Sequence, residues 1–160
     1  MPPRQRARYV VQQHWSRRGD WKINDWALEL GVFRDRRPIG MVALRAREFP
    51  VLREVKTESW LGLAHQRQGL GTEARAALLH LAFDGLAAVS AVSEVFQDNV
   101  ASQGVSSRLG YRHDGISRDI LDGKPVISDR LRLNREDWQQ PPLVPVSISM
   151  LAPCLPLFGC

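Results

Sequence analysis

The sequence predicts an α/β fold, in which strands and helices build one domain. Strand-like runs occur on both sides of a long apolar helical segment, and a glycine-rich turn joins one of these runs to that helix. Two further strand-like runs flank Asp122-Gly123, which is a strong hairpin signal. A chain of 160 residues, 44% of them hydrophobic, is expected to form a single domain with a real core.

The first half of the chain predicts a helix followed by three strands. Residues 5–18 place apolar side chains at helical spacing, so we expect a helix there. Residues 26–33 and 39–46 are strand-like runs, and the turn residues at 35–38 between them favour an antiparallel hairpin. Residues 54–63 are expected to form a third strand that ends at the glycine-rich turn.

The second half opens with the long helical segment, residues 72–86. It is apolar almost all round, which is typical of a helix buried on several sides, here against the sheet. Residues 91–96 indicate a further strand. Asn99 is suited to cap the next helix, and Gly110 stands just past its expected end. That helix should bury a stripe formed by Ala101, Val105 and Leu109.

The last strands and the tail complete the prediction. Residues 116–121 and 125–133 flank Asp122-Gly123 and should pair as a hairpin. Residues 139–160 carry no charge and five prolines, yet they are too apolar for a disordered segment. We therefore expect a domain at 1–138 and a tail that packs on it or on a partner subunit, which favours a homodimer.

Composition and charge narrow the function classes. The formal net charge is +5, but much of the positive charge is interspersed with acidic residues, which disfavours a nucleic-acid-binding module. Cys154 and Cys160 make neither a disulfide framework nor a zinc pattern, so a reducing, cytoplasmic location is expected. No signal peptide opens the chain, and no apolar run approaches the about 18 residues of a membrane span. The histidines show no metal-site spacing, and no metal is expected.

The glycine-rich turn, Gln66-Arg67-Gln68-Gly69-Leu70-Gly71-Thr72, is the most specific feature of the chain. Two glycines one residue apart let the backbone approach a ligand closely. The following helix turns its free N–H groups and the positive end of its dipole toward that ligand. This arrangement favours a phosphate. A plain tight turn before a helix would look similar and remains the alternative on these residues alone.

The turn and its flanks resemble a known family. The spacing Gln66-x-x-Gly69-x-Gly71 resembles the acyl-coenzyme A signature of the GNAT superfamily of N-acetyltransferases. Further segments resemble its RimJ/RimL-like branch, namely Ser59-Trp60-Leu61, Thr72-Glu73-Ala74, residues 98–102 and Leu109-Gly110-Tyr111. Four more segments resemble an actinobacterial subgroup of this branch, some of whose members transfer a succinyl group. These segments are His14-Trp15, Asp25-Trp26, residues 135–138 and residues 154–159.

The resemblance implies both a fold and an activity. The GNAT fold is a mixed, mostly antiparallel twisted sheet flanked by helices, and its N-terminal strand and helix are expected to be missing here. The activity would be acyl-coenzyme A dependent transfer of an acetyl or succinyl group to a primary amine of a protein N-terminus or small molecule. Acetyl-coenzyme A, succinyl-coenzyme A or coenzyme A itself would be the bound cofactor. A non-catalytic coenzyme A-binding fragment is the alternative.

The same resemblance assigns residues to the cofactor. The strand end near Leu61 would pair with the pantetheine arm and polarise the thioester carbonyl. Backbone N–H groups of the turn would bind the pyrophosphate. The expected cofactor-binding residues are Leu61, Gly62, Leu63, Gln66, Arg67, Gln68, Gly69, Leu70, Gly71, Thr72, Asn99, Ser102 and Ser106.

The expected catalytic residues are Ser102, Glu58 and Glu54. By resemblance, Ser102 lies near the departing sulfur, and Ser106 stands where many members carry a proton-donating tyrosine. The branch commonly places a carboxylate where this chain has Lys56. Glu54 and Glu58 share a strand face with that position by two-residue alternation, so either is a candidate base. A charged, half-exposed strand face and simple helix capping are the alternative explanations of these residues.

Overall fold

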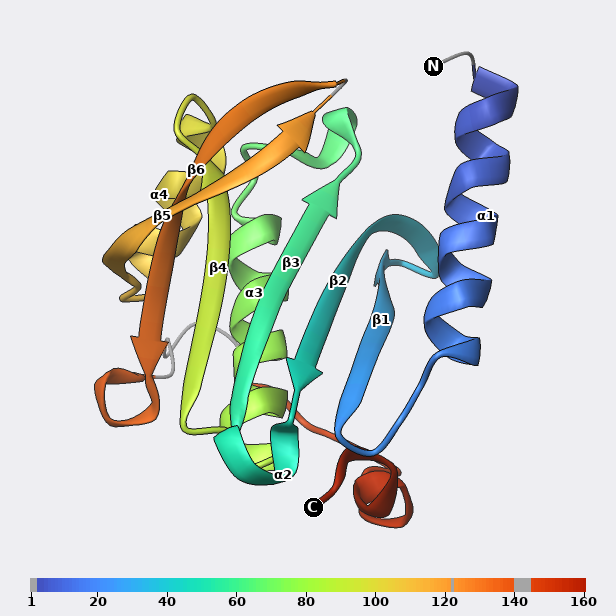
Figure 1. Cartoon of the computed structure of the whole chain (residues 1–160), viewed down its shortest axis with the longest axis vertical. Coiled ribbons are helices and arrows are strands. Elements are labelled where there is room, and N and C mark those ends of the chain that lie inside the picture. Colours follow the sequence, from blue (N-terminus) through green and yellow to red (C-terminus); the bar gives the residue numbers. More distant parts are fainter. Residues whose placement is uncertain (1–2, 122, 140–144) are drawn as a thin grey trace.

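The computed structural model describes residues 3–121, 123–139 and 145–160, which form one six-stranded sheet with helices on both faces (Figure 1). The strands are β1 (Asp25–Arg34), β2 (Arg37–Arg47), β3 (Glu54–Leu61), β4 (Ser90–Phe96), β5 (Arg112–Leu121) and β6 (Lys124–Asn134). Their order is β1-β2-β3-β4-β6-β5, and every neighbouring pair is antiparallel except β3 and β4. The mixed, mostly antiparallel sheet implied by the sequence is confirmed.

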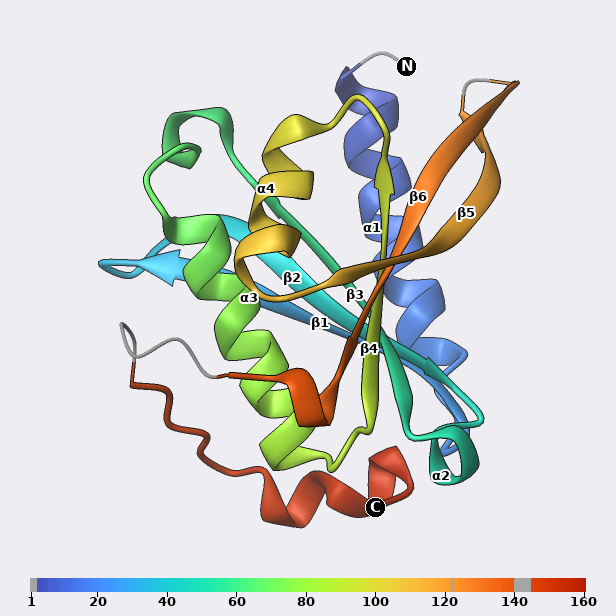
Figure 2. The same ribbon diagram turned by 90° about the vertical axis from the view of Figure 1, so that its left-hand side faces the viewer.

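Helices cover both faces of the sheet. The helices are α1 (Pro3–Gly19), α2 (Phe49–Leu52), α3 (Leu70–His80) and α4 (Val100–Arg108), with the short turns η1 (Leu63–His65), η2 (Leu81–Gly85), η3 (Arg135–Asp137) and η4 (Ala152–Phe158). α1 lies on one face of the sheet, and α3 and α4 lie on the other (Figure 2). In the described ranges, no helix is long and apolar enough to cross a bilayer.

The two predicted hairpins are present. The turn between β1 and β2 consists of Asp35 and Arg36, which both have positive φ, 49° and 64°. Two left-handed residues in succession suit the right-handed twist of the strands that they join. At the second hairpin Gly123 has a φ of 77°, whereas Asp122 lies outside the described residues.

The core lies between α3 and the sheet. Leu79 and Phe83 are fully buried on the helical side, and they face a sheet in which Leu44, Val55 and Leu133 are buried. The prediction of a helix buried on several sides is confirmed, with one addition. The last turn of that helix, η2, widens into a π-helix.

The predicted buried stripe of α4 is only partly correct. Leu109 is buried and Val105 is half-buried, but Ala101 is exposed. Because α4 packs through its later turns, its first turn faces solvent, and Ser106 is its fully buried residue.

The described part of the tail packs on the domain. Phe158 is 5% exposed, and its ring makes edge contacts with Trp21 and Trp26, with centroids 5.3 and 4.9 Å away. Trp21 Nε1 donates to the carbonyl oxygen of Leu157 at 2.9 Å. Residues 140–144, which include two of the tail prolines, lie outside the described residues. The division into a domain and a tail stays a prediction.

Candidate active site

The two central strands diverge in the middle of the sheet. β3 and β4 pair over three residues each, ending at Lys56 and Val92. Beyond that point β3 stays paired with β2, and β4 stays paired with β6. We call the opening between residues 57–61 of β3 and residues 93–96 of β4 the wedge. It leaves one backbone edge of β3 without a strand partner, which an extended ligand can complete.

A buried hydrogen-bond relay closes the narrow end of the wedge. Thr57 Oγ1 donates to the carbonyl oxygen of Val92 at 3.3 Å and lies 2.9 Å from the Tyr111 hydroxyl. Because the Thr57 proton is used on Val92, the Tyr111 hydroxyl donates to Thr57 Oγ1. Burial raises the pKa of Tyr111, and the hydrogen bond to Thr57 and the charge of Arg75 oppose that rise. This relay ties β3 and β4 together where their pairing ends.

The wide end of the wedge presents a backbone donor. The Gly62 N–H donates to the carbonyl oxygen of Ile39 on β2 at 2.9 Å. Because N–H groups alternate in direction along an extended strand, the N–H groups of Leu61 and Ser59 point the other way, into the wedge. The Leu61 carbonyl oxygen accepts from Gln66 Nε2 at 2.9 Å. The predicted donor at Leu61 therefore faces the opening.

The turn before α3 gathers free N–H groups. Arg67 and Gly69 have positive φ, 59° and 80°, and the Thr72 and Glu73 N–H groups donate back to the Gly69 carbonyl oxygen at 3.0 and 3.1 Å. The N–H groups of residues 67–71 have no hydrogen-bond acceptor among the described residues. Together with the helix dipole, these donors form a site suited to an anion such as a phosphate.

The side chains of the turn mainly hold its shape. Gln68 Nε2 donates to the Ala64 carbonyl oxygen at 2.9 Å, and Gln68 Oε1 accepts from Arg34 Nη1 at 3.2 Å. Leu63 is exposed, and Leu70 is half-buried as the first residue of α3. The expected cofactor residues between Leu61 and Thr72 thus lie in one continuous segment at the mouth of the wedge, and its backbone is better placed for ligand contacts than its glutamine side chains.

The serines of α4 occupy two different positions. Asn99 Oδ1 accepts from the Ser102 N–H at 3.1 Å, so the predicted cap is confirmed. The Asn99 amide nitrogen and the Ser102 hydroxyl have no hydrogen-bond partner among the described residues. Ser106 differs from the expectation, because it is fully buried and its Oγ accepts from Arg75 Nη1 at 3.1 Å. α4 turns this hydroxyl inward, toward Arg75 of α3.

Arg75 is the site residue that the sequence analysis missed. It is 3% exposed, yet among the described residues its guanidinium donates only to serines, one each on β3, β4 and α4: Ser59, Ser93 at 3.5 Å and Ser106. Burial lowers the pKa of Arg75, and the Tyr111 phenol opposes this. Its sequence signal was a charge inside an apolar helical segment, four residues after the second glycine of the turn.

The candidate carboxylates lie on the opposite face of β3. Glu54, Lys56 and Glu58 share that face, as predicted from alternation, because Val55 and Thr57 between them are buried toward α3. Lys56 forms an ion pair with the Glu94 carboxylate. Glu58 forms an ion pair with a guanidinium of the neighbouring strand β2, at 3.0 Å.

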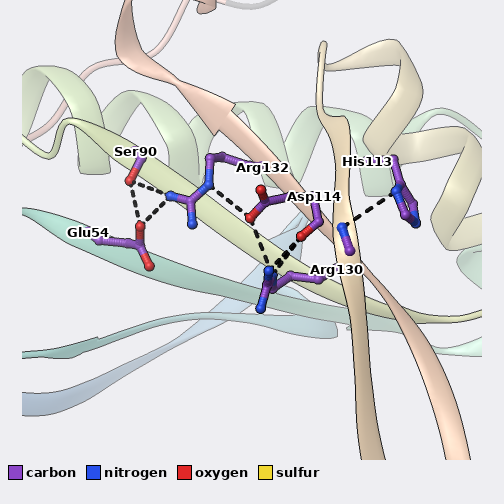
Figure 3. Close-up of polar contacts among 7 residues, drawn as sticks. Glu54, Ser90, His113, Asp114, Arg130 and Arg132 are labelled. Atoms are coloured by element: carbon purple, nitrogen blue, oxygen red, sulfur yellow. Dashed lines mark hydrogen bonds and ion pairs between the residues drawn. The ribbon is translucent and has the colours of Figure 1, made fainter.

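Glu54 belongs to a chain of ionic contacts (Figure 3). It accepts from Ser90 Oγ at 2.9 Å and pairs with Arg132, which lies between Glu54 and Asp114. Arg132 Nε donates to Asp114 Oδ2 at 3.0 Å, and this hydrogen bond lowers the pKa of Asp114. The hydrogen bond to Glu54 is the main reason why the pKa of Arg132 is raised. Glu54 therefore forms an ion pair with Arg132, and it lies in the part of β3 that pairs with β4.

The carboxylate face is hollowed into a cavity of about 630 Å³ between α1 and the sheet. Cationic and anionic side chains both line it. They are Arg17, Asp20, Asp25, Arg45, Arg47, Glu54, Lys56, Glu94, Arg130 and Arg132. A cavity on one face, and an anion site at the mouth of the wedge on the other, can receive two polar reactants from opposite sides of the sheet.

Comparison with known proteins identifies the family to which the chain belongs. Residues 1–112 match the family model for the acetyltransferase (GNAT) domain. The chain belongs to the GNAT acetyltransferase family. Its members move an acyl group from acyl-coenzyme A to an amine, and the chain is an N-acetyltransferase. The family and the fold implied by the sequence are confirmed.

Solved structures agree with this assignment. A Vibrio cholerae protein assigned as a ribosomal-protein-serine acetyltransferase is 27% identical, with a TM-score of 0.64 over 77% of this chain and 72% of that one. Mycobacterium smegmatis RimJ, in complex with CoA-disulfide, has a TM-score of 0.72 at 18% identity over 79% and 61%. The microcin C7 self-immunity acetyltransferase MccE, in complex with acetyl-CoA and AMP, has a TM-score of 0.65 at 20% identity over 79% and 68%. The last two show likeness of fold alone.

Proposed function

We propose that this GNAT enzyme transfers an acetyl or succinyl group from its coenzyme A thioester directly to a primary amine of a protein N-terminus or a small molecule. The observation that carries the proposal is the wedge, which opens at a turn whose N–H groups at 67–71 lack acceptors among the described residues. An extended pantetheine arm and a pyrophosphate fit these two features in series.

The backbone would hold the cofactor. The pyrophosphate would accept from the N–H groups of residues 67–71, and Arg67 is exposed and able to add a charge-assisted contact. The pantetheine would lie along the free edge of β3, and Asn99 would contact it from α4. The Leu61 N–H, which points into the wedge, would polarise the thioester carbonyl and stabilise the tetrahedral intermediate.

The amine would approach from the opposite face, where the cavity is lined by Glu54 and by Arg45, the ion-pair partner of Glu58. Glu58 stands on the diverging part of β3, and Glu54 on the paired part, so we propose Glu58 first and Glu54 second as the base, acting directly or through water. The amine nitrogen attacks the thioester carbon, the C–S bond breaks, and sulfur departs with the electron pair. Ser102 would lie near that sulfur, and no covalent enzyme intermediate is formed.

A thermal-shift titration with coenzyme A, acetyl-coenzyme A and succinyl-coenzyme A tests the proposal. A ligand at a hundredfold over its Kd adds about 2.7 kcal/mol to the free energy of unfolding. The key variant is Gly71→Glu. A Cβ at Gly71 would lie 3.7 Å from Leu61, an ordinary contact, so the backbone tolerates a side chain while its carboxylate obstructs and repels a bound pyrophosphate.

Gly19→Glu is the matched control, because a Cβ there meets no atom within 4 Å and the site lies at the end of α1. We expect the ligand-induced shift in the wild type and in Gly19→Glu, and its loss in Gly71→Glu. Cooperative melting without any shift in the wild type would refute the cofactor site. The ligand that gives the largest shift identifies the acyl group to assay with model amines.

We also propose the RimJ/RimL-like branch, and within it the actinobacterial subgroup, as the relatives in function. The RimJ-like fold and the 27% identity to the Vibrio cholerae protein support the branch.

A homodimer is proposed because the tail exposes Met150 and Leu157 at 79% and 56%. Light scattering of the purified chain measures the mass in solution, and a monomer would exclude the dimer.

A further inference from the structure

The inference concerns Arg75, and it rests on the proposed function. Its guanidinium is buried beside the wedge and forms no ion pair with a carboxylate of the described residues. Its Nε atom is buried, and no described residue forms a hydrogen bond with it. Burying an arginine without a counter-charge is costly, since hydroxyl acceptors replace lost hydration but do not neutralise the charge. A side chain that only joined β3, β4 and α4 by hydrogen bonds would not need to carry a positive charge here.

The position of the guanidinium relates it to the wedge. Ser59 lies three residues past the last paired residue of β3, and Ser93 lies one residue past that of β4. Arg75 donates to both, so it spans the two diverging strands on the α3 face. Its third partner, Ser106, comes from α4. A ligand that fills the wedge from its mouth passes beside this cation.

The serine hydroxyls can extend the effect of the charge. Each serine oxygen accepts from Arg75 and therefore keeps its own O–H free to donate. A hydroxyl that accepts from a cation is polarised and becomes a stronger donor. Ser59 is the half-buried member of the set, and it stands on the free edge of β3. An anion in the wedge would meet polarised hydroxyls backed by a buried positive charge.

We propose that Arg75 is a positioning and electrostatic residue that stabilises the departing thiolate of coenzyme A. During transfer the C–N bond forms, the C–S bond breaks, and the electron pair goes to sulfur. The amine proton goes to the base or to water, and the thiolate later takes a proton from water. The chain thus favours the anionic leaving group by charge rather than by a phenolic proton donor at position 106.

The titratable group that faces Arg75 is Tyr111, which is buried against it and hydrogen-bonded to Thr57. Its own proton is engaged in the relay at the narrow end of the wedge. The phenol is neutral below about pH 10. Over the range in which a thiol ionises, the charge at the wedge therefore comes from Arg75.

The test measures the pKa of the coenzyme A thiol when it is bound to the full chain, by the ultraviolet absorbance of the thiolate across a pH series. A free thiol has a pKa of about 8.5, and a cation within a few ångströms lowers a pKa by about one unit or more. We expect this lowering in the wild type. Arg75→Met, a neutral side chain of similar length, should return the thiol pKa to its ordinary value, and Arg75→Lys should retain part of the effect.

An analogue of coenzyme A without the sulfur atom is the control ligand. It should bind the wild type and Arg75→Met equally, whereas coenzyme A at a pH above its thiol pKa should bind Arg75→Met about tenfold more weakly. Arg75 would then act on the sulfur and not on the shape of the site. Ser93→Ala is the matched structural variant, because it removes the hydrogen bond from Arg75 to Ser93 and keeps the positive charge of Arg75.

The outcomes are distinct. A bound thiol whose pKa in the wild type equals or exceeds that of the free thiol overturns the inference, even if Arg75→Met fails to fold. An unchanged pKa in a folded Arg75→Met also overturns it, and leaves the proposed function standing. Failure of both coenzyme A and the analogue to bind the wild type overturns the proposed function together with the inference.

Discussion

Replacing Phe158 by alanine should destabilise the whole domain, although only two residues follow it in the sequence. Phe158 is 5% exposed, and its ring packs edge-on against Trp21 and Trp26. Truncating a buried phenylalanine costs about 3–5 kcal/mol, and each aromatic pair accounts for about 0.5–1.5 kcal/mol of such a loss. A domain of this size loses about 2–4 °C in Tm per kcal/mol, so Tm should fall by about 6–20 °C.

Leu157→Ala provides the comparison, because Leu157 is 56% exposed and contacts Trp21 through its backbone carbonyl. Its cost should stay within about 0.5 kcal/mol. Urea and thermal unfolding of both variants, followed by tryptophan fluorescence, measure the difference. Equal, small effects of the two substitutions would refute the reasoning, since the tail would then not belong to the cooperative unit.

Three further substitutions probe the wedge and the carboxylate face. Burial raises the pKa of Tyr111 above 10.0, so its contribution to stability is complete below pH 10 and is lost as pH rises through the folded pKa. The urea midpoint of the wild type should therefore fall more steeply above pH 10 than that of Tyr111→Phe, and parallel curves would contradict the burial of the phenol. Glu58→Gln should lower kcat by about a hundredfold if Glu58 is the base, and Glu54→Gln should lower it less. The reverse ranking in steady-state assays would move the base to the paired part of β3.

Local patterns predicted most of the fold. Helical spacing, alternation and turn residues placed the described strands and the helices α1, α3 and α4 near their observed positions, although β5 begins at Arg112 rather than at residue 116 and the short helix α2 was not predicted. The turn at 66–72 was also predictable, since glycine spacing and the start of a helix are local properties. Ala101 was wrongly placed in the core, because burial of a helix face depends on which of its turns meets a neighbour.

Long-range geometry was not predictable in the same way. The point at which β3 and β4 part depends on pairing with β2 and β6, and no local pattern reports it. Arg75 appeared as one charge in an apolar helix, because its three serine partners lie in separate elements. Likewise, the contact between Glu54 and Arg132 joins residues that are 78 positions apart.

The parting of the central strands has a mechanical consequence. The sheet behaves as two three-stranded leaves, β1-β2-β3 and β4-β6-β5, whose direct ladder is only three residue pairs long. If the two three-stranded halves move relative to each other, the width of the wedge changes while the strand pairing within each half stays intact. A pantetheine that forms hydrogen bonds with the free edge of β3 would resist that motion. Ligand binding in the wedge would therefore make the entire sheet stiffer. Slowed amide hydrogen exchange should then extend from Ser59 and Leu61 into strands that the ligand never touches.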